Sequence, residues 1–366
     1  MILSSKDLLD FTKQVFIAMG SPEKQAETAA ACLNAADLRG VDSHGVARLS
    51  GYVRLWEKNR LNARPEMKIV HETPSTAVLD GDLGAGLVTA AEAMAIAVRK
   101  AKTAGTGWVA VKNSNHFGIA GFHAMLALEH DMIGVALTNA SPLVSPTFGK
   151  SRLLGTNPIA VAIPALTQPP LVVDMATTTV ANGKLEVLQR EGKDAPLGWA
   201  QDKDGNPTTD AFALKKGGSM LPLGGDRQHG GHKGYCLGAL VDIFSAVLPG
   251  ANYGPWVPPF VAFLDPSDEK TGDGIGHFIG AMRLDAFRPA DEFKKHMDNW
   301  INAFRQSESI DSCNNVLIPG DPERILTEER LKNGIPVQDA VIEDLRQLAE
   351  KFKITVDIFL DDIHFE

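Results

Sequence analysis

A histidine and an arginine that could act together on a carboxylate stand in residues 42–48, which read DSHGVAR. If this segment is helical, His44 and Arg48 share one face, because side chains four positions apart are neighbours on a helix. Arginine offers a planar pair of donors that matches a carboxylate, and histidine exchanges a proton near neutral pH. The pair therefore suits a site that holds a carboxylate beside a proton carrier. The residue types alone also allow a capped helix start with solvated charges.

A second histidine, His116, lies in residues 113–118, which read NSNHFG and follow the strand-like segment Gly107–Val111. Proteins of the α/β class commonly place site residues at such a junction between a strand and a loop. Small polar side chains beside an aromatic residue and a histidine are typical of a pocket rim. A buried histidine with a purely structural role is the alternative, and the pattern does not decide between them.

Two further segments have the composition of phosphate-binding turns. Residues 174–179 read DMATTT at the end of a strand, and residues 230–234 read GGHKG at the start of a helix. Small residues let the backbone approach an anion closely, a helix N-terminus favours negative charge, and Lys233 adds a point charge. Residues 84–89, GAGLVT, also stand where a dinucleotide-binding turn would, but Thr89 replaces the third glycine of that motif. A simple glycine turn into a helix is the better interpretation of 84–89.

Metal chemistry is the least favoured alternative for these residues. Five histidines could in principle converge on an ion in a metal-dependent hydrolase: His44, His116, His123, His229 and His232. None of them belongs to the short-spaced histidine and carboxylate signature of a zinc enzyme. The three cysteines, Cys32, Cys236 and Cys313, are far apart and form no Cys-x-x-Cys pair. We expect no metal site, and metal analysis of purified protein would test this expectation.

An α/β framework must position the candidate residues. Apolar residues at helical spacing predict two antiparallel helices over Ser4–Asp37, separated at Gly20, and a third helix through Tyr52 and Trp56. Beyond Pro65, strands and helices alternate, which predicts a mixed sheet. The predicted strands are Met67–Val70, Thr76–Asp80, Gly107–Val111, Ile133–Thr138, Ile159–Ile163, Leu171–Asp174, His277–Met282 and Val316–Ile318. The predicted later helices are Ala90–Lys102, Phe122–Glu129, Tyr235–Leu248, Asp291–Phe304, Thr327–Asn333 and Val337–Phe352.

Composition excludes several classes of function. The chain has 366 residues, of which 44% are hydrophobic and 22% charged, as in an ordinary globular enzyme. A net charge of −9 and the lack of a dense basic run disfavour nucleic-acid binding. No N-terminal export signal and no apolar run of about 18 residues is present, which argues against a membrane partner. With so few cysteines, the reducing cytoplasm is the expected compartment.

In their order along the chain, these motifs resemble those of the malate/L-lactate dehydrogenase family. That family includes L-sulfolactate, ureidoglycolate and diketogulonate dehydrogenases and piperideine-carboxylate reductases. The resemblance spans about Leu8 to Pro322, and although no single motif would suffice, the ordered set is specific. The matching segments are 42–45 (DSHG) with Arg48, 115–118 (NHFG), 155–158 (GTNP), 174–177 (DMAT), 183–184 (GK), 198–200 (GWA) with 207–209 (PTT), and 231–234 (GHKG).

The resemblance implies an α/β fold of the L-sulfolactate dehydrogenase type, with three layers and a mixed sheet rather than a Rossmann fold. It implies an N-terminal helical part, residues 1–75, that carries His44 and Arg48 and packs with C-terminal helices in 323–366. Residues 76–322 would form the α/β part that binds cofactor and substrate. It further implies a homodimer with the substrate near the subunit interface.

The resemblance also implies the function of an NAD(P)-dependent oxidoreductase that moves a hydride between nicotinamide and a small 2-hydroxy or 2-keto acid. His44, Arg48 and His116 would line the substrate pocket, and either histidine could carry the proton. NAD is the expected cofactor, with NADP also open. Its expected contacts are Asp174, Met175, Ala176, Thr177, Lys233, Pro319, Gly320 and Asp321. A reductase of a cyclic imino acid or of diketogulonate and a non-catalytic small-molecule binding protein are the alternatives.

Overall fold

A mixed sheet of seven strands forms the centre of the computed structural model, which describes residues 1–310 and 315–355. The strand order is β2-β3-β4-β11-β5-β6-β7. The strands are β2 (Lys68–Glu72), β3 (Thr76–Gly84), β4 (Thr106–Ser114), β5 (Met132–Thr138), β6 (Ile159–Ile163), β7 (Leu171–Met175) and β11 (Ile275–Arg283). Only β3 and β4 pair in parallel, and the helix α4 (Gly86–Ala104) connects them. The sequence predicted this strand-helix-strand unit and the mixed character of the sheet.

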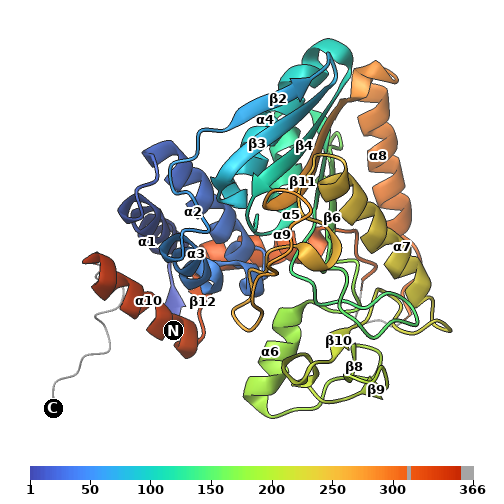
Figure 1. Cartoon of the computed structure of the whole chain (residues 1–366). Coiled ribbons are helices and arrows are strands. Elements are labelled where there is room, and N and C mark those ends of the chain that lie inside the picture. The colour runs from blue at the N-terminus through green and yellow to red at the C-terminus, as the bar shows by residue number, and fades with distance from the viewer. Residues whose placement is uncertain (311–314, 356–366) are drawn as a thin grey trace.

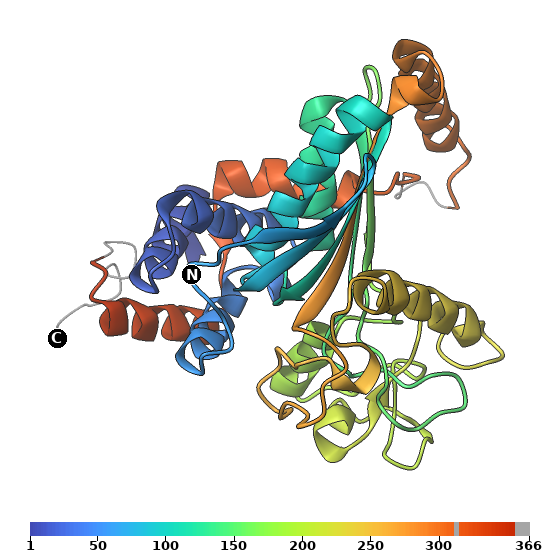
Figure 2. The same ribbon diagram turned by 45° about the horizontal axis from the view of Figure 1, so that its top comes forward.

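Helices cover both faces of the sheet, which gives the three layers seen in Figure 2. On one face lie α4 and α5 (Ala120–Met125). They approach closely because glycines face them: a Cβ on Gly134 would stand 2.0 Å from the carbonyl oxygen of Ala124. On the other face, α7 (Gly231–Asp242) continues into a π-helical turn, Ile243–Val247, against β4, β5 and β11. This arrangement confirms the prediction of a three-layer α/β fold.

A layer of helices beside the sheet contains elements from both ends of the described chain (Figure 1). It contains α1 (Ser5–Ala18), α2 (Glu23–Leu38), α3 (Leu49–Glu57) and α10 (Asp339–Phe352), together with the pair of short strands β1 (Ile2–Leu3) and β12 (Ile335–Pro336). Helix α1 begins where the Ser4 side chain accepts a hydrogen bond from the backbone N–H of Asp7. Apolar side chains of α1, α2, α3 and α10 form one core cluster. Of the predicted C-terminal segment 323–366, residues 356–366 lie outside the described residues.

A smaller lobe lies below the sheet in Figure 1. The sequence did not predict it. It comprises α6 (Asn182–Glu191) and a three-stranded sheet in the order β10-β8-β9. These strands are β8 (Ala200–Gln201), β9 (Pro207–Thr208) and β10 (Ser219–Met220). The lobe has its own core around Leu185 and Met220. This lobe supplies one wall of the pockets described below.

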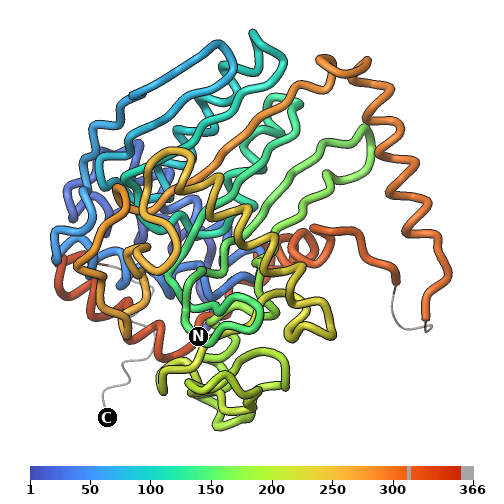
Figure 3. Tube along the Cα trace, turned by 45° about the vertical axis from the view of Figure 1, so that its right-hand side comes forward, coloured from blue at the N-terminus to red at the C-terminus, as the bar shows by residue number. Residues whose placement is uncertain are grey.

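The last part of the chain runs along the β6–β7 edge of the sheet, where α8 (Ala290–Arg305) lies at the side of the molecule (Figure 3). The predicted strand Val316–Ile318 is wrong, because these residues form no strand. Among the described residues, one backbone hydrogen bond links β7 to the residue after this segment, from the N–H of Val172 to the carbonyl oxygen of Pro319. At Gly320 (φ +97°) the chain turns into α9 (Asp321–Asn333). In the part of the chain that the structure describes, no helix is long and apolar enough to cross a membrane.

Candidate active site

The segment with His44 and Arg48 forms two consecutive 3₁₀ turns, Asp42–His44 and Val46–Arg48, rather than one α-helix. The buried carboxyl group of Asp37, on α2, accepts a hydrogen bond of 2.9 Å from the backbone N–H of Val46, and burial raises its pKa to about 8. The same carboxyl group packs directly on Gly45, where an added Cβ would lie 1.8 Å from its Oδ1 atom. Asp37 therefore fixes the break between the two turns. The break between the two turns, and not a common helix face, brings the side chains of His44 and Arg48 into one pocket.

The rings of His44 and His116 stack, with centroids 5.6 Å apart and an interplanar angle of 20°. His116 follows the end of β4, and its loop packs on α4, where a Cβ on Gly86 would lie 2.1 Å from the carbonyl oxygen of Asn115. Gly86 thus serves this close packing, while Gly84 makes room for Pro65 and the backbone of Gly81. These packing roles explain the glycines of 84–86 without a dinucleotide-binding turn. The structure brings the two predicted histidines together from segments far apart in the sequence.

Tyr52, on α3, fixes the orientation of His116. Its buried hydroxyl lies 2.7 Å from Nδ1 of His116 and 3.3 Å from the carbonyl oxygen of the same residue. The ring of Phe260 stacks on the imidazole of His116, with centroids 4.3 Å apart. For His44, the hydroxyl of Ser43 lies 2.9 Å from Nδ1. Each histidine therefore has one ring nitrogen engaged by a hydroxyl group.

Burial keeps both histidines uncharged at neutral pH. The pKa of His44 falls to about 4, mainly because burial disfavours the charged ring and further because Arg48 is positive. The pKa of His116 lies well below its ordinary value for the same reason, with His44, Arg48 and His277 adding to the effect. A carboxylate beside Arg48 would neutralise part of this positive charge. Binding of an acid would therefore make it easier for a histidine to hold a proton.

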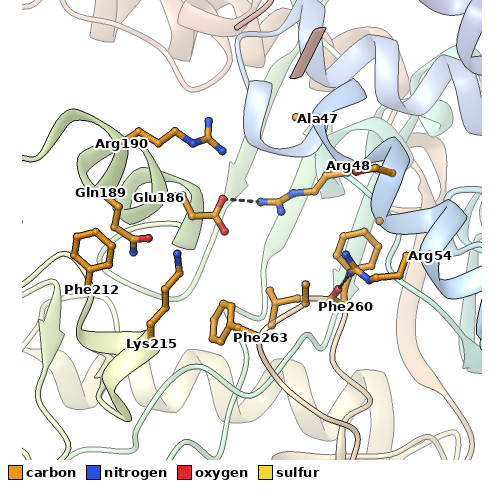
Figure 4. A pocket seen from close by; sticks show the side chains of 14 residues that line it. Ala47, Arg48, Arg54, Glu186, Gln189, Arg190, Phe212, Lys215, Phe260 and Phe263 are labelled. Carbon is orange, nitrogen blue, oxygen red and sulfur yellow. Dashed lines mark hydrogen bonds and ion pairs between the residues drawn. The ribbon is translucent and has the colours of Figure 1, made fainter. Parts of the chain in front are cut away.

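Arg48 is held by its own turn and by the small lobe. Its Nε donates a hydrogen bond of 2.5 Å to the carbonyl oxygen of Ser43. Its Nη2 lies 3.7 Å from Oε2 of Glu186 on α6, a loose ion pair drawn in Figure 4. The guanidinium thus keeps donors available for a bound anion. Glu186 was not among the predicted site residues.

A cavity of about 200 Å³ lies between the N-terminal helices, the sheet and the small lobe, and it is lined by His44, Arg48, His116 and Phe260. Its apolar wall is formed by Ile119, Ala120, Leu143, Pro158 and Met175. The predicted cofactor contacts Asp174, Met175 and Ala176 line the same cavity. Asp174 accepts a hydrogen bond of 2.8 Å from the backbone N–H of Gly121, and burial raises its pKa to about 6. An apolar wall beside two neutral histidines and an arginine fits a nicotinamide ring next to an acid substrate.

The other predicted cofactor residues lie elsewhere. Thr177 is buried, and its hydroxyl donates to the carbonyl oxygens of Thr156 and Asn157, both at 3.1 Å. Lys233 is exposed on the first turn of α7 and does not line the cavity. The turn Pro319–Asp321 leads into α9 and accepts a backbone hydrogen bond from Val172 on β7. Asp321 is buried and pairs with Arg305 at 2.7 Å and Arg324 at 3.2 Å. The role of these residues in cofactor binding stays a prediction.

The remaining histidines do not converge on an ion. His123 and His277 are buried in the core on either side of the Phe117 ring. Over residues 1–310 and 315–355, no group of three or more His, Cys, Asp or Glu side chains is arranged to hold a metal. The structure therefore offers no support for the alternative of a metal-dependent hydrolase.

Sequence reasoning did not identify Tyr52, Phe260 or Glu186 as site residues. Tyr52 carries a usable signal, because it stands four residues after Arg48 at the start of a predicted helix. Phe260 and Glu186 reach the site only through long-range packing of an irregular loop and the small lobe. No local pattern in the sequence indicates either of them.

Comparison with known proteins gives the same answer as the motifs. Residues 3–346 match the family model described as malate/L-lactate dehydrogenase. The chain is 41% identical over 345 residues to malate dehydrogenase of Pyrococcus horikoshii, covering 94% of this chain and 93% of that protein. The structure of sulfolactate dehydrogenase from Methanocaldococcus jannaschii superposes with a TM-score of 0.86 at 36% identity, covering 96% of this chain and 98% of that one. Malate dehydrogenase from Entamoeba histolytica superposes with a TM-score of 0.90 at 34% identity, covering 98% and 99%. The chain belongs to the malate/L-lactate dehydrogenase family.

Proposed function

We propose that this dehydrogenase is an NAD(P)-dependent oxidoreductase that moves a hydride between nicotinamide and C2 of a small 2-hydroxy or 2-keto acid. The observation that carries the proposal is the placement of Arg48 beside two stacked, uncharged histidines in a cavity with an apolar wall. The names of relatives make malate the first hydroxy acid to test. NAD is the first cofactor to test, and NADP the second.

In the proposed mechanism, Arg48 binds the substrate carboxylate through its free guanidinium donors. His116 takes the proton of the C2 hydroxyl during oxidation and returns it to the keto oxygen during reduction. A bound nicotinamide supplies the acceptor or donor of the hydride at C2. The cavity residues Asp174, Met175 and Ala176 would hold it, and the apolar wall excludes water from the reacting carbon. Lys233 and the Pro319–Asp321 turn would bind more distant parts of the cofactor.

Tyr52 makes His116 the preferred proton carrier in this proposal. When Tyr52 donates to the carbonyl oxygen of His116, it accepts from Nδ1–H, and the second ring nitrogen is free to take a proton. After His116 has taken the hydroxyl proton, both ring nitrogens carry hydrogen, and Tyr52 still accepts from Nδ1–H. During reduction the second nitrogen gives its proton to the keto oxygen, which leaves the ring neutral with hydrogen on Nδ1. One hydroxyl thus supports both protonation states of His116. His44 would tune this step through its stacked ring.

The test is oxidation of NADH and NADPH, followed optically, with oxaloacetate, pyruvate, sulfopyruvate, diketogulonate and a cyclic imino acid as substrates. Turnover of a 2-keto acid would support the proposal and identify the cofactor. Turnover of the imino acid or of diketogulonate alone would favour those alternatives. Binding of NADH without any turnover would favour a non-catalytic binding protein. In an active enzyme, His116→Asn should lose far more kcat than His44→Asn.

We also propose a homodimer in the cytoplasm. The outer face of α7 and its π-helical extension exposes Leu240, Phe244, Val247 and Leu248 by 42% to 60%, an apolar stripe that a second copy would cover. A monomeric mass by light scattering would contradict the dimer, and recovery outside the cytoplasmic fraction would contradict the compartment. Residues 1–75 with the C-terminal helices would supply His44 and Arg48, and residues 76–322 the cofactor site.

A further inference from the structure

Ser141 is a buried serine that lines the histidine cavity and takes no part in the mechanism above. It lies just after β5, and 6% of the residue is exposed. Its side-chain oxygen accepts a hydrogen bond of 2.9 Å from the backbone N–H of Phe260. A serine hydroxyl can donate one hydrogen bond while it accepts another. Over the described ranges 1–310 and 315–355, no acceptor is found for the hydroxyl hydrogen of Ser141, so this donor remains available to a ligand.

The two residues before Ser141 fix its position. The side chain of Asn139 donates a hydrogen bond of 2.8 Å to the carbonyl oxygen of Asn252. The backbone N–H of Ala140 donates one of 3.2 Å to the buried side chain of Asn157. A donor that is held in this way needs no rearrangement when an acceptor arrives. Ser141 therefore has the support that a substrate-binding group requires.

Phe260 connects Ser141 with the proposed proton carrier. Its backbone N–H binds Ser141, and its ring stacks on His116 with centroids 4.3 Å apart. Arg54, beside it in Figure 4, donates a hydrogen bond of 2.5 Å to its carbonyl oxygen, and a Cβ on Gly51 would stand 2.6 Å from its Cζ atom. Ser141 and His116 thus line the same cavity and contact the same clamped residue, which favours a contact of both with one substrate atom.

We propose that the hydroxyl group of Ser141 donates a hydrogen bond to the oxygen on C2 of the bound acid, an inference that rests on the proposed function. Arg48 serves the carboxylate, so the C2 oxygen is the acceptor that remains beside His116. When a hydride adds to C2 of a 2-keto acid, the carbonyl π electrons move onto this oxygen, which takes a proton from His116. Ser141 keeps its own hydrogen throughout. Because negative charge grows on the oxygen, the hydrogen bond from Ser141 is stronger in the transition state than in the ground state.

The first test is the single-turnover rate at which the complex of enzyme and NADH reduces a 2-keto acid. Ser141→Ala removes a hydrogen bond to a charged oxygen and should lower this rate about 10- to 150-fold. Ser141→Cys keeps a side chain of similar size but donates weakly, and it should lower the rate by at least about threefold. In both variants, the Kd of NADH should stay within about twofold of the wild type.

Ser145→Ala is the matched control. Ser145 is also buried, but its hydroxyl bonds to the side chain of Ser219 at 2.6 Å and it does not line the cavity. Its substitution should leave the rate within about twofold of the wild type.

The second test separates a contact with the substrate from an effect through Phe260, because Ser141→Ala also removes the acceptor of the Phe260 N–H. It compares the binding of two acids that differ only in the hydroxyl on C2 to the complex of enzyme and NADH. The two acids are malate and succinate if the wild type reduces oxaloacetate, and lactate and propionate if it reduces pyruvate. Ser141→Ala should weaken the hydroxy acid about 3- to 10-fold and leave the acid without the hydroxyl within about twofold.

Equal weakening of both acids, or a rate that Ser141→Ala and Ser141→Cys leave unchanged, would overturn the contact with the C2 oxygen while the proposed function stands. A loss confined to NADH affinity would also overturn it, because Ser141 would then bind the cofactor. Failure of the wild type to reduce any 2-keto acid would overturn the proposed function and this inference with it.

Discussion

The contact between Gly45 and Asp37 gives the sharpest test of how the active-site turn is built. A methyl group at position 45 would lie 1.8, 2.2 and 2.5 Å from the three carboxyl atoms of Asp37. Gly45→Ala therefore forces the whole carboxyl group away from the backbone N–H of Val46. Asp37→Ala removes the same group and leaves room for the methyl. The two substitutions should thus be strongly coupled.

The size of the coupling follows from the contacts. Gly45→Ala should cost about 1–3 kcal/mol for overpacking and about 1–3 kcal/mol for the lost hydrogen bond of a buried group. Asp37→Ala should cost about 1–3 kcal/mol, since it leaves the Val46 N–H without its acceptor. In the Asp37→Ala background, the added methyl meets no carboxyl group, and its cost should fall below about 1 kcal/mol. The double variant should therefore be more stable than the sum predicts, by roughly 1 kcal/mol or more.

Urea unfolding of the wild type, both single variants and the double variant measures this coupling, and kcat/KM measures its effect on the site. Gly45→Ala should lower kcat/KM by about 100-fold, because a shift near 1 Å separates His44 from Arg48. The double variant should recover part of that loss. Free energies that add within about 0.5 kcal/mol would refute the reasoning.

Three further outcomes are expected. Arg48→Lys should lower kcat/KM for the acid about 10- to 150-fold, because the ammonium group of lysine lacks the paired donors that bind the carboxylate. The Kd of NADH should stay within about twofold of the wild type. An equal loss of substrate use and of NADH binding would contradict the assignment of Arg48 to the substrate. Tyr52→Phe should lower kcat/KM about 5- to 150-fold by removing the hydroxyl at Nδ1 of His116, and an unchanged rate would exclude this role. Burial lowers the pKa of His123 from 6.5 to about 4, so its contribution to stability is complete above pH 6.5 and is lost as the pH falls toward 4. His123→Gln should therefore reduce the slope of unfolding free energy against pH in that window by about 1.4 kcal/mol per unit, as measured by urea unfolding.

Local patterns predicted most of the framework. Helix α1 shows its buried face in the spacing of Leu8, Phe11 and Val15, and β6 has the bounds that its apolar run predicts. Helix α6 was missed because it is largely polar and buries a single large apolar side chain, Leu185. The run Val316–Ile318 was overpredicted, since an apolar segment becomes a strand only where a partner edge is available.

The sequence predicted which residues line the site better than it predicted their hydrogen-bond partners and charge states. The motifs indicated His44, Arg48 and His116, and the structure places all three around one cavity. Tyr52 had a local signal in its spacing from Arg48, whereas Phe260 reaches His116 only through folding that no local pattern encodes. Burial, which makes the histidines neutral, is likewise a property of the packed structure.

The pairing of β1 with β12 has a consequence for how the enzyme becomes active after synthesis. Leu3 pairs with Ile335, and Arg330 on α9 binds both Asp42 and the backbone of Asp37, so the turn with His44 depends on residues that are made after β11 of the central sheet. A chain leaving the ribosome can form its first helices early, but it lacks the partners that complete their core. Closing a loop of this length is slow compared with local folding. Activity should therefore appear only when the C-terminal helices dock, after the central sheet has formed.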